Sequence, residues 1–244
     1  MNKSMEYFAE VSRILEQVRT TQADVIDQAA QAVADALLGD GMIYAFGTGH
    51  SHMLAEELFY RAGGLVRVYP IMDTPLMLHV NASRSSNMER LSGYAHTLLQ
   101  DGPQIKKGDV MFLFSNSGRN AVPLEMAVEA KELGAKTICI TNLNHSSHVT
   151  SRHASGKKLY ELCDIVIDNC GCVGDAAITI GDQVCGPTSS AVGTAILQAI
   201  VCGAVEKVRD AGQIPEVFIS GNVDGKEEVG KAYIEKYRNI IRML

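Results

Sequence analysis

The stretch "MIYAFGTGHSHMLAEEL", residues 42–58, predicts the fold of this chain. Its first five residues form a short apolar run of strand-forming side chains, which is typical of a strand buried on both faces. Glycines and hydroxyl-bearing residues follow, and a helical pattern begins within the next few positions. A buried strand, a glycine-containing turn and a helix make the first half of a βαβ unit, so we expect a parallel sheet covered by helices.

The rest of the chain repeats this alternation of strands and helices. Apolar residues at helical spacing from Met5 to Leu38 predict one long helix or two, and the helix that starts near His50 is expected to end before Gly63. Further strands are expected at 65–70, 109–114, 136–140 and 164–168, with a candidate sixth at 176–180, and further helices at 88–100, 120–133, 189–209 and 225–243.

This alternation predicts an α/β fold, a doubly wound parallel sheet in three layers with helices on both faces. The 244 residues suit a single domain, because α/β sheets of this length form one unit with a large core. Residues 1–38 would add N-terminal helices to the core, and residues 211–244 would form a C-terminal extension. In such a sheet ligands bind beyond the carboxyl ends of the strands, so function is sought in the residues that follow each strand.

Composition excludes several classes of partner. The net charge is −6 and no basic block is present, which argues against nucleic acid, because that affinity depends on clustered phosphate contacts. Charges run through the N-terminal residues, and no stretch matches the roughly 20 apolar residues of a membrane span. We therefore expect a cytoplasmic protein with no membrane partner. The six cysteines follow no disulfide framework, and the pair Cys170 and Cys172 would need two further ligands to hold zinc.

A polar loop follows the first predicted strand. Gly47 and Gly49 would allow a tight turn and a close approach of the backbone to a ligand. Thr48, His50 and Ser51 offer side-chain donors where a helix begins, which is itself a favourable place for an anion. The alternative is that these residues only make the turn and cap the helix.

A second loop of the same kind, "SNSGRN", follows the third predicted strand. It contains Ser115, Asn116, Ser117, Gly118 and Arg119, and a helix starts immediately after it. If the strand order is 2-1-3-4-5, the first and third strands flank the point where the connections change direction, and both loops face one crevice. Two such loops together favour an anion site over simple capping.

A third group of hydroxyls, Thr188, Ser189 and Ser190, precedes a long apolar helix. One N-cap uses one hydroxyl, so three in a row exceed the needs of capping. Hydroxyls and backbone N–H groups can hold a phosphate without a lysine cradle, which suits a small phosphorylated metabolite. Nucleotide sites fit poorly: a G-x-x-x-x-G-K-[ST] motif is missing, and the dinucleotide fingerprint fails at its last glycine, where His52 stands.

These motifs resemble the sugar isomerase (SIS) domain family. "SNSG" is close to the Ser-x-Ser-Gly of that family, and "PTSSAVGTAILQ" resembles the opening of its late helix. The similarity covers roughly residues 30 to 210, and the whole chain looks most like stand-alone bacterial SIS-domain proteins of uncharacterised function. The resemblance implies a flavodoxin-like strand order 2-1-3-4-5 and a homodimer or tetramer with sites near the subunit interfaces. It also implies that Ser115, Ser117 and Thr188–Ser190 hold the phosphate of a sugar, with Gly47–Ser51 along the sugar.

The helix after the first loop carries the candidates for acid–base chemistry. Moving a proton between neighbouring carbons of a sugar needs a carboxylate or an imidazole in a partly dry pocket. His52, Glu56 and Tyr60 have i, i+4, i+8 spacing and are expected to share one helix face. Glu57 matches the catalytic glutamate in the "AEEL" of phosphoheptose isomerases, which resemble this chain, although it is also placed to pair with Arg61. That family has a histidine on the late helix which this chain lacks, so we expect no metal and no cofactor.

Three other polar regions are open alternatives for completing the site. His145, His148 and His153 lie after the fourth strand, in a loop that also contains Arg152, Lys157 and Lys158. Residues 79–90 are either a lid that contributes His79 or Arg84, or a crossover. Ser220 and Asn222 follow an apolar run near the end of the chain and could reach the site of a neighbouring subunit.

The sequence leaves three functions open. The favoured hypothesis is an enzyme that binds a sugar phosphate and isomerises it between aldose and ketose, with Glu56 or Glu57 and a histidine moving the proton. The alternatives are a non-catalytic sensor or regulator that binds a sugar phosphate, and a lyase similar to the etherases of the family.

Overall fold

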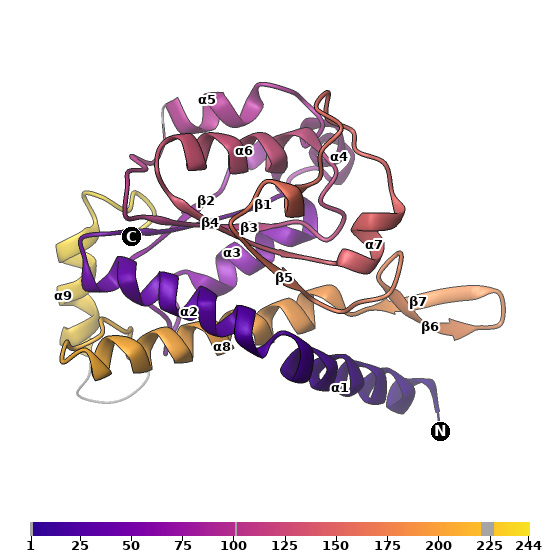
Figure 1. Cartoon of the computed structure of the whole chain (residues 1–244), viewed down its shortest axis with the longest axis horizontal. Coiled ribbons are helices and arrows are strands. Elements are labelled where there is room, and N and C mark those ends of the chain that lie inside the picture. Colours follow the sequence, from indigo (N-terminus) through magenta and orange to yellow (C-terminus); the bar gives the residue numbers. More distant parts are fainter. Residues whose placement is uncertain (1, 101, 221–226) are drawn as a thin grey trace.

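The computed structural model describes residues 2–100, 102–220 and 227–244. Its centre is a sheet of five parallel strands in the order β2-β1-β3-β4-β5, which confirms the predicted fold class and strand order (Figure 1). The register aligns Ile43 of β1 with Val68 of β2 and with Val110 of β3. The strands are β1 Ile43–Gly47, β2 Val68–Ile71, β3 Val110–Phe114, β4 Lys136–Thr141 and β5 Ile165–Asp168.

Helices cover both faces of the sheet because alternate residues of each buried strand point to opposite sides. Ile43 and Ala45 join a core with α1 Lys3–Thr21, α2 Ala23–Leu38, α3 His52–Leu58 and α8 Ser189–Asp210. Tyr44 and Phe46 join a second core with α5 Tyr94–Gln100, α6 Ala121–Glu132 and α9 Glu227–Tyr237. Two shorter helices, α4 Ala82–Met88 and α7 Leu143–His148, lie near the carboxyl ends of the strands (Figure 1).

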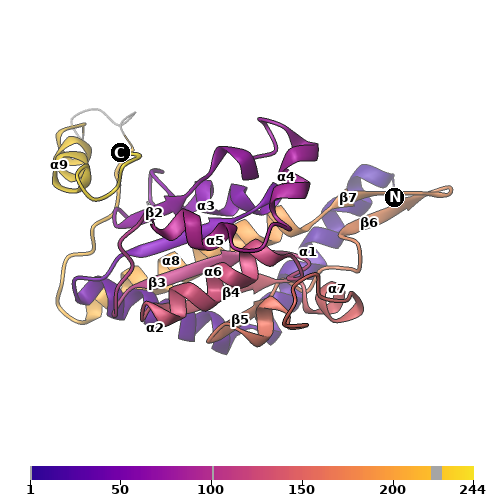
Figure 2. The same ribbon diagram turned by 90° about the horizontal axis from the view of Figure 1, so that it is seen from above.

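The N-terminal region forms two helices, one of the two possibilities that its pattern left open. Helix α1 projects beyond the sheet and lies beside the antiparallel hairpin of β6 Ala176–Ile180 and β7 Gln183–Pro187 (Figure 2). The hydroxyl of Tyr7 donates to the carbonyl of Pro187, 2.8 Å away. The candidate sixth strand therefore exists but does not join the main sheet, because most of its residues are half-exposed or exposed and lack the two-sided burial of a central parallel strand.

The second strand begins at Val68, three residues later than expected. Residues 64–66 pair instead with the segment after α8: the N–H of Val66 donates to the carbonyl of Glu216, and Leu65 bridges Val217. This pairing accounts for the apolar run near the end of the chain, which forms a single bridge rather than a strand of the sheet. Asn222, one candidate in this region, lies outside the described residues.

Two predicted helices differ from the observed ones. The helix expected at 88–100 is interrupted, because Gly93 adopts a left-handed conformation with φ +83° and separates α4 from α5. Helix α3 ends at Leu58, and Tyr60 lies beyond it with φ +47°. The expectation that His52, Glu56 and Tyr60 share one helix face is therefore wrong for Tyr60, whose ring packs edge-on against Phe218.

Helix α8 has the length and apolar composition of a membrane span, contrary to the expectation that no stretch would. Its fully buried residues, among them Val192, Ile196 and Ile200, pack in the core against α2 and α3. Its hydropathy is thus accounted for as that of a core helix.

Candidate functional site at the carboxyl ends of the strands

The loop after β1 is shaped by glycine. A Cβ atom on Gly47 would lie 2.5 Å from the carbonyl oxygen of Ser51, so only glycine fits this turn. Gly49 has φ +58° and opens a single 3-10 turn that leads into α3. As a result His50 and Ser51 face a small cavity, whereas the Thr48 hydroxyl donates to Glu89, 2.8 Å away, and does not line it.

The loop after β3 is held by its own serine. The Ser115 hydroxyl accepts a hydrogen bond from the N–H of Gly118 at 3.1 Å, and Gly118 itself has φ +54°. The side-chain oxygen of Asn116 accepts from Asn169, which follows β5. Ser115 and Asn116 line the cavity. Ser117 is not part of the lining, and its hydroxyl has no hydrogen-bond partner within the described part of the chain.

The start of α8 is capped by a carboxylate that the sequence did not reveal. Asp175 accepts hydrogen bonds from the N–H groups of Thr188 and Ser189, at 3.1 and 2.9 Å. Its carboxylate also accepts from their hydroxyls, at 3.4 and 2.6 Å. Two of the three predicted phosphate hydroxyls are therefore engaged by an internal anion. Of these three residues, only Ser190 lines the cavity with a hydroxyl that is not hydrogen-bonded to any described residue.

The loops after β1 and β3 meet at this cavity because they follow neighbouring parallel strands, and the start of α8 joins them from the end of the hairpin. It has a volume of about 130 Å³ and lies at the carboxyl ends of β1, β3, β4 and β5. Its lining consists of His50, Ser51, Leu54, Ser115, Asn116, Ile140, Asn169, Asp175, Ser189 and Ser190. Hydroxyls, amides, one imidazole and one carboxylate thus surround a space that could hold a polar small molecule.

Positive charge gathers beside the loop after β3. Arg119 extends toward Thr150, 3.4 Å away, and its buried Nε atom has no hydrogen-bond partner. Burial lowers the pKa of Lys158, and the nearby Arg119 lowers it further. The pKa of His145 is also lowered, by burial first and then by the charges of Arg119 and Lys158. Arg119 and Lys158 thus bring positive charge to the neighbourhood of the loop after β3, which favours an anion there.

The acid–base candidates on α3 lie outside the cavity lining. Glu56 is exposed, with its carboxylate 3.6 Å from Nε2 of the buried His52, whose Nδ1 faces the carbonyl of Gly49. Glu57 accepts hydrogen bonds from Arg61 and, at 3.1 Å, from Gln198 of α8. The pairing of Glu57 with Arg61 that the spacing allowed is thus present, and catalysis by Glu56, Glu57 or His52 stays a prediction.

The other candidate groups take separate places around the site. His79 lies beside His52, with ring centroids 5.8 Å apart, and the backbone N–H of Arg84 donates to Asn81 at the start of α4. His145 accepts from the N–H of Gly174, next to Asp175. His148 and His153 bond to neighbours in their own loop. Within residues 2–100, 102–220 and 227–244, groups of three or more potential metal ligands do not occur.

Two polar residues of the lining were missed by the sequence reasoning. Asn169 follows β5 directly, so the rule that function lies after each strand would have found it. Asp175 carried a weaker signal, because it lies seven residues beyond β5 in a left-handed conformation with φ +69° at the base of the hairpin. Its role as the cap of α8 depends on a fold that brings residues 175 and 188 together.

Residues 6–142, more than half of the chain, match the family model of the SIS domain. The chain therefore belongs to the SIS domain family. Over 241 residues it is 45% identical to a UPF0309 protein of Geobacillus thermodenitrificans, an alignment that covers 98% of this chain and 96% of that relative.

Solved structures with the same fold include an enzyme and a sugar-phosphate complex. The phosphoheptose isomerase GmhA of Neisseria gonorrhoeae has a TM-score of 0.52 and 19% identity, covering 84% of this chain and 97% of that one. The NanR protein of Vibrio vulnificus, complexed with ManNAc-6P, has a TM-score of 0.50 and 18% identity, covering 98% and 70%. At these identities the similarity shows the fold alone.

Proposed function

We propose that this protein binds a phosphorylated sugar at the carboxyl ends of the strands and isomerises it between aldose and ketose. The observation that carries the proposal is the meeting of three hydroxyl-bearing loops, after β1, after β3 and before α8, at one cavity. The solved neighbours that act on or bind sugar phosphates support it at the level of the fold.

The phosphate is held by hydroxyls that have no protein partner. Ser190 in the cavity lining and Ser117, next to the lining residue Asn116, meet this requirement within the described residues. Arg119 brings a guanidinium with a buried, unpartnered Nε to the loop that contains Ser117. Each charge-assisted hydrogen bond to a phosphate contributes on the order of 1.5–3 kcal/mol. His50 and Ser51 are then left to contact the sugar.

The proton transfer is assigned to Glu56 or Glu57 together with His52. A base must lie within hydrogen-bond reach of the proton that it removes, or act through one water molecule. Glu56 is solvent-exposed and next to His52, whereas Glu57 would first have to leave Arg61 and Gln198. A glutamate-to-glutamine change at each position in turn distinguishes the two.

The proposal is tested by incubating the protein with hexose, aminosugar and heptose phosphates in heavy water. Isomerisation through an enediol incorporates deuterium at the carbon next to the carbonyl, which NMR or mass spectrometry detects. We expect incorporation by the wild-type protein and about a tenfold or greater loss of sugar-phosphate affinity in Ser117→Ala. Ser155→Ala, in a loop outside the cavity, is the matched control. Binding without exchange would reject the isomerase.

A second candidate, a non-catalytic sensor of sugar phosphates, is favoured by one observation. None of His52, Glu56 and Glu57 lines the cavity, so the described side chains form a binding site more completely than a catalytic one. In that case the deuterium experiment would give binding without exchange, and the phosphate loops would keep their roles.

We also propose that the protein acts in the cytoplasm as a homodimer or tetramer. An apolar groove of about 430 Å³ lies between α1, α2 and α8, lined by residues such as Leu15, Ile26 and Ile196. On the same projecting helix the Phe8 side chain is 63% exposed. A second copy of the chain covering this face would bury both, and sedimentation equilibrium of the wild-type protein and of Phe8→Glu tests this directly.

A further inference from the structure

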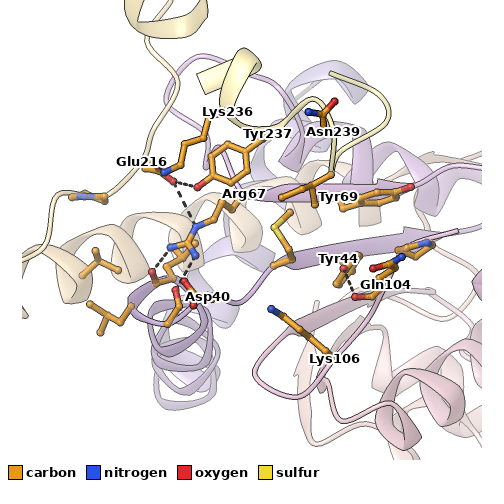
Figure 3. Close-up of a pocket in the computed structure, with 18 of the residues that line it drawn as sticks. Asp40, Tyr44, Arg67, Tyr69, Gln104, Lys106, Glu216, Lys236, Tyr237 and Asn239 are labelled. Atoms are coloured by element: carbon orange, nitrogen blue, oxygen red, sulfur yellow. Dashed lines mark hydrogen bonds and ion pairs between the residues drawn. The ribbon is translucent and has the colours of Figure 1, made fainter. Parts of the chain in front are cut away.

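A second cavity lies at the opposite end of the sheet, where β1 and β2 begin (Figure 3). Its volume is about 910 Å³, within the range of roughly 300–1,000 Å³ that small-molecule sites occupy. The walls come from the end of α2, the segments 102–106 and 213–216, and residues 236–242 at and beyond the end of α9. The carboxyl-end site uses none of these residues.

One wall of this amino-end cavity is fixed by a half-buried arginine. Arg67 donates to the carbonyls of Gly39 and Gly41, at 2.9 and 3.2 Å, and to that of Leu37. Its buried Nε has no hydrogen-bond acceptor, with the nearest Glu216 oxygen 3.6 Å away. The guanidinium therefore satisfies the carbonyls at the end of α2 and holds positive charge in one place, which lowers the cost of ordering a site for a ligand.

Glu216 ties this wall to α9. Its carboxylate accepts hydrogen bonds from Lys236, at 2.6 Å, and from the hydroxyl of Tyr237 (Figure 3). Burial opposes ionisation of this group, but the bonds from Lys236 and Tyr237 outweigh it, so its pKa is lowered. The negative charge of Glu216 is thus already balanced by Lys236 within the protein.

The charge that remains around the cavity is positive. The Lys106 ammonium has no ion pair or hydrogen bond with any described residue, and it lies on the wall opposite Lys236 (Figure 3). Two carboxylates, Asp40 and Glu216, face four cationic side chains in the lining: Arg67, Lys106, Lys236 and Arg242. In a chain of net charge −6 this is a local reversal of sign, which selects for an anion.

The uncharged groups of the cavity suit a ligand with a polar ring. Tyr44 and Tyr69 form a buried floor with ring centroids 5.6 Å apart. Burial raises the pKa of Tyr44, so its hydroxyl stays neutral and donates to the carbonyl of Gln104. The side-chain amides of Gln104 and Asn239 provide both donors and acceptors, which match the hydroxyls or the ring edges of a metabolite.

We propose that the amino-end cavity is a second ligand site that binds a metabolite-sized phosphate ester, with Lys106 contacting the phosphate. Sugar phosphates and nucleoside monophosphates share this chemistry. The site is separate from the carboxyl-end loops and does not depend on the function proposed for them.

The test is a calorimetric titration of the full chain with glucose 6-phosphate, fructose 6-phosphate, AMP and UMP. Glucose and adenosine serve as uncharged controls and inorganic phosphate as the bare anion. The variant Lys106→Glu reverses the unpaired charge, and Lys107→Glu makes the same change on the adjacent exposed lysine outside the lining. We expect Lys106→Glu to weaken the binding of at least one ester by about tenfold or more and Lys107→Glu to change it less than about twofold.

Hydrogen exchange then locates the ligand. Binding at the proposed site slows exchange in peptides that cover 37–42, 102–106 and 236–242, and the esters that do so identify the source as sugar phosphate or nucleotide. The proposal would be overturned if protection were confined to residues 47–51 and 115–119, or if both lysine variants weakened binding equally. It would also be overturned if the Ser117→Ala variant no longer bound any of the esters. The Ser117→Ala variant separates the two sites, because it removes only the hydroxyl of the carboxyl-end loop.

Discussion

The two ends of the central sheet hold different kinds of polar surface. At the carboxyl end, glycine turns and hydroxyls surround a cavity of about 130 Å³. The carboxylate of Asp175 accepts hydrogen bonds from the start of α8 there. At the amino end, ionic side chains surround a cavity of about 910 Å³. Cavity size alone would place the main site at the amino end. The doubly wound topology and the three loops favour the carboxyl end, because parallel sheets bring the ends of neighbouring strands together there.

The difference has a physical origin in the backbone. Loops that follow parallel strands lead into helix N-termini, whose free N–H groups attract anions and can be combined with hydroxyls. At the amino end of the sheet the preceding helices end, and cations stabilise their exposed carbonyl groups. Arg67 stabilises the carbonyls at the end of α2 in this way. Each end therefore gathers the side chains that its helix termini require.

The largest expected effect comes from the carboxyl end. Gly47→Ala should lower the free energy of unfolding by about 2–4 kcal/mol, because the new Cβ would lie 2.5 Å from the Ser51 carbonyl oxygen. Chemical denaturation measures this loss, and sugar-phosphate binding should disappear with it. Gly49→Ala is the control: it places a side chain at φ +58° in open space and should cost about 1–2 kcal/mol. Equal losses would mean that the turn is not held as described.

A smaller effect is expected at the amino end from Glu216→Gln, about 1–2 kcal/mol near pH 7. The pKa of Glu216 is lowered in the folded state, so its contribution is present above the unfolded value of 4.5 and is lost as the pH falls through the lower folded pKa. The difference in stability between wild type and variant should therefore shrink below about pH 4.5. Glu235→Gln removes an exposed carboxylate on α9 and should cost less than about 0.5 kcal/mol at any pH. A difference that grows in acid would contradict the pairing.

The smallest effect is expected from Asp175→Asn. The amide keeps the hydrogen bonds to the start of α8 but loses the favourable charge at the helix terminus, so stability should fall by at most about 1 kcal/mol. Affinity for a sugar phosphate should rise about threefold or more, because a like charge is removed from the cavity. Asp182→Asn, on the exposed turn of the same hairpin, changes the net charge equally and should leave the affinity unchanged. Weaker binding in Asp175→Asn would mean that the carboxylate contacts the ligand directly.

Much of the fold followed from the sequence because buried parallel strands are continuous apolar runs that end at polar loops. The loops around Gly47, Ser115 and Thr188 could be identified for the same reason, since each is local in the chain. Two features escaped this reasoning. Asp175 reaches α8 through a hairpin, and the walls of the amino-end cavity come from five separate segments, so no spacing in the sequence links Arg67 to Glu216.

The sequence does not separate the candidates for acid–base chemistry, for a different reason. The pattern on α3 gives the order of His52, Glu56 and Glu57, but which of them reaches a substrate depends on where the helix ends and what α8 presents to it. The hydrogen bond from Gln198 to Glu57 arises from this packing and cannot be recognised in the local sequence.

The carboxyl-end loops are proposed to bind a sugar phosphate. The most direct measurement is a titration of ¹⁵N-labelled protein with the sugar-phosphate panel, followed by backbone amide shifts. We expect the largest shifts at Ser51, Ser117, Gly118 and Ser190, and their loss in Ser117→Ala. Shifts confined to the amino-end cavity, or shifts at these four residues that Ser117→Ala leaves intact, would contradict it.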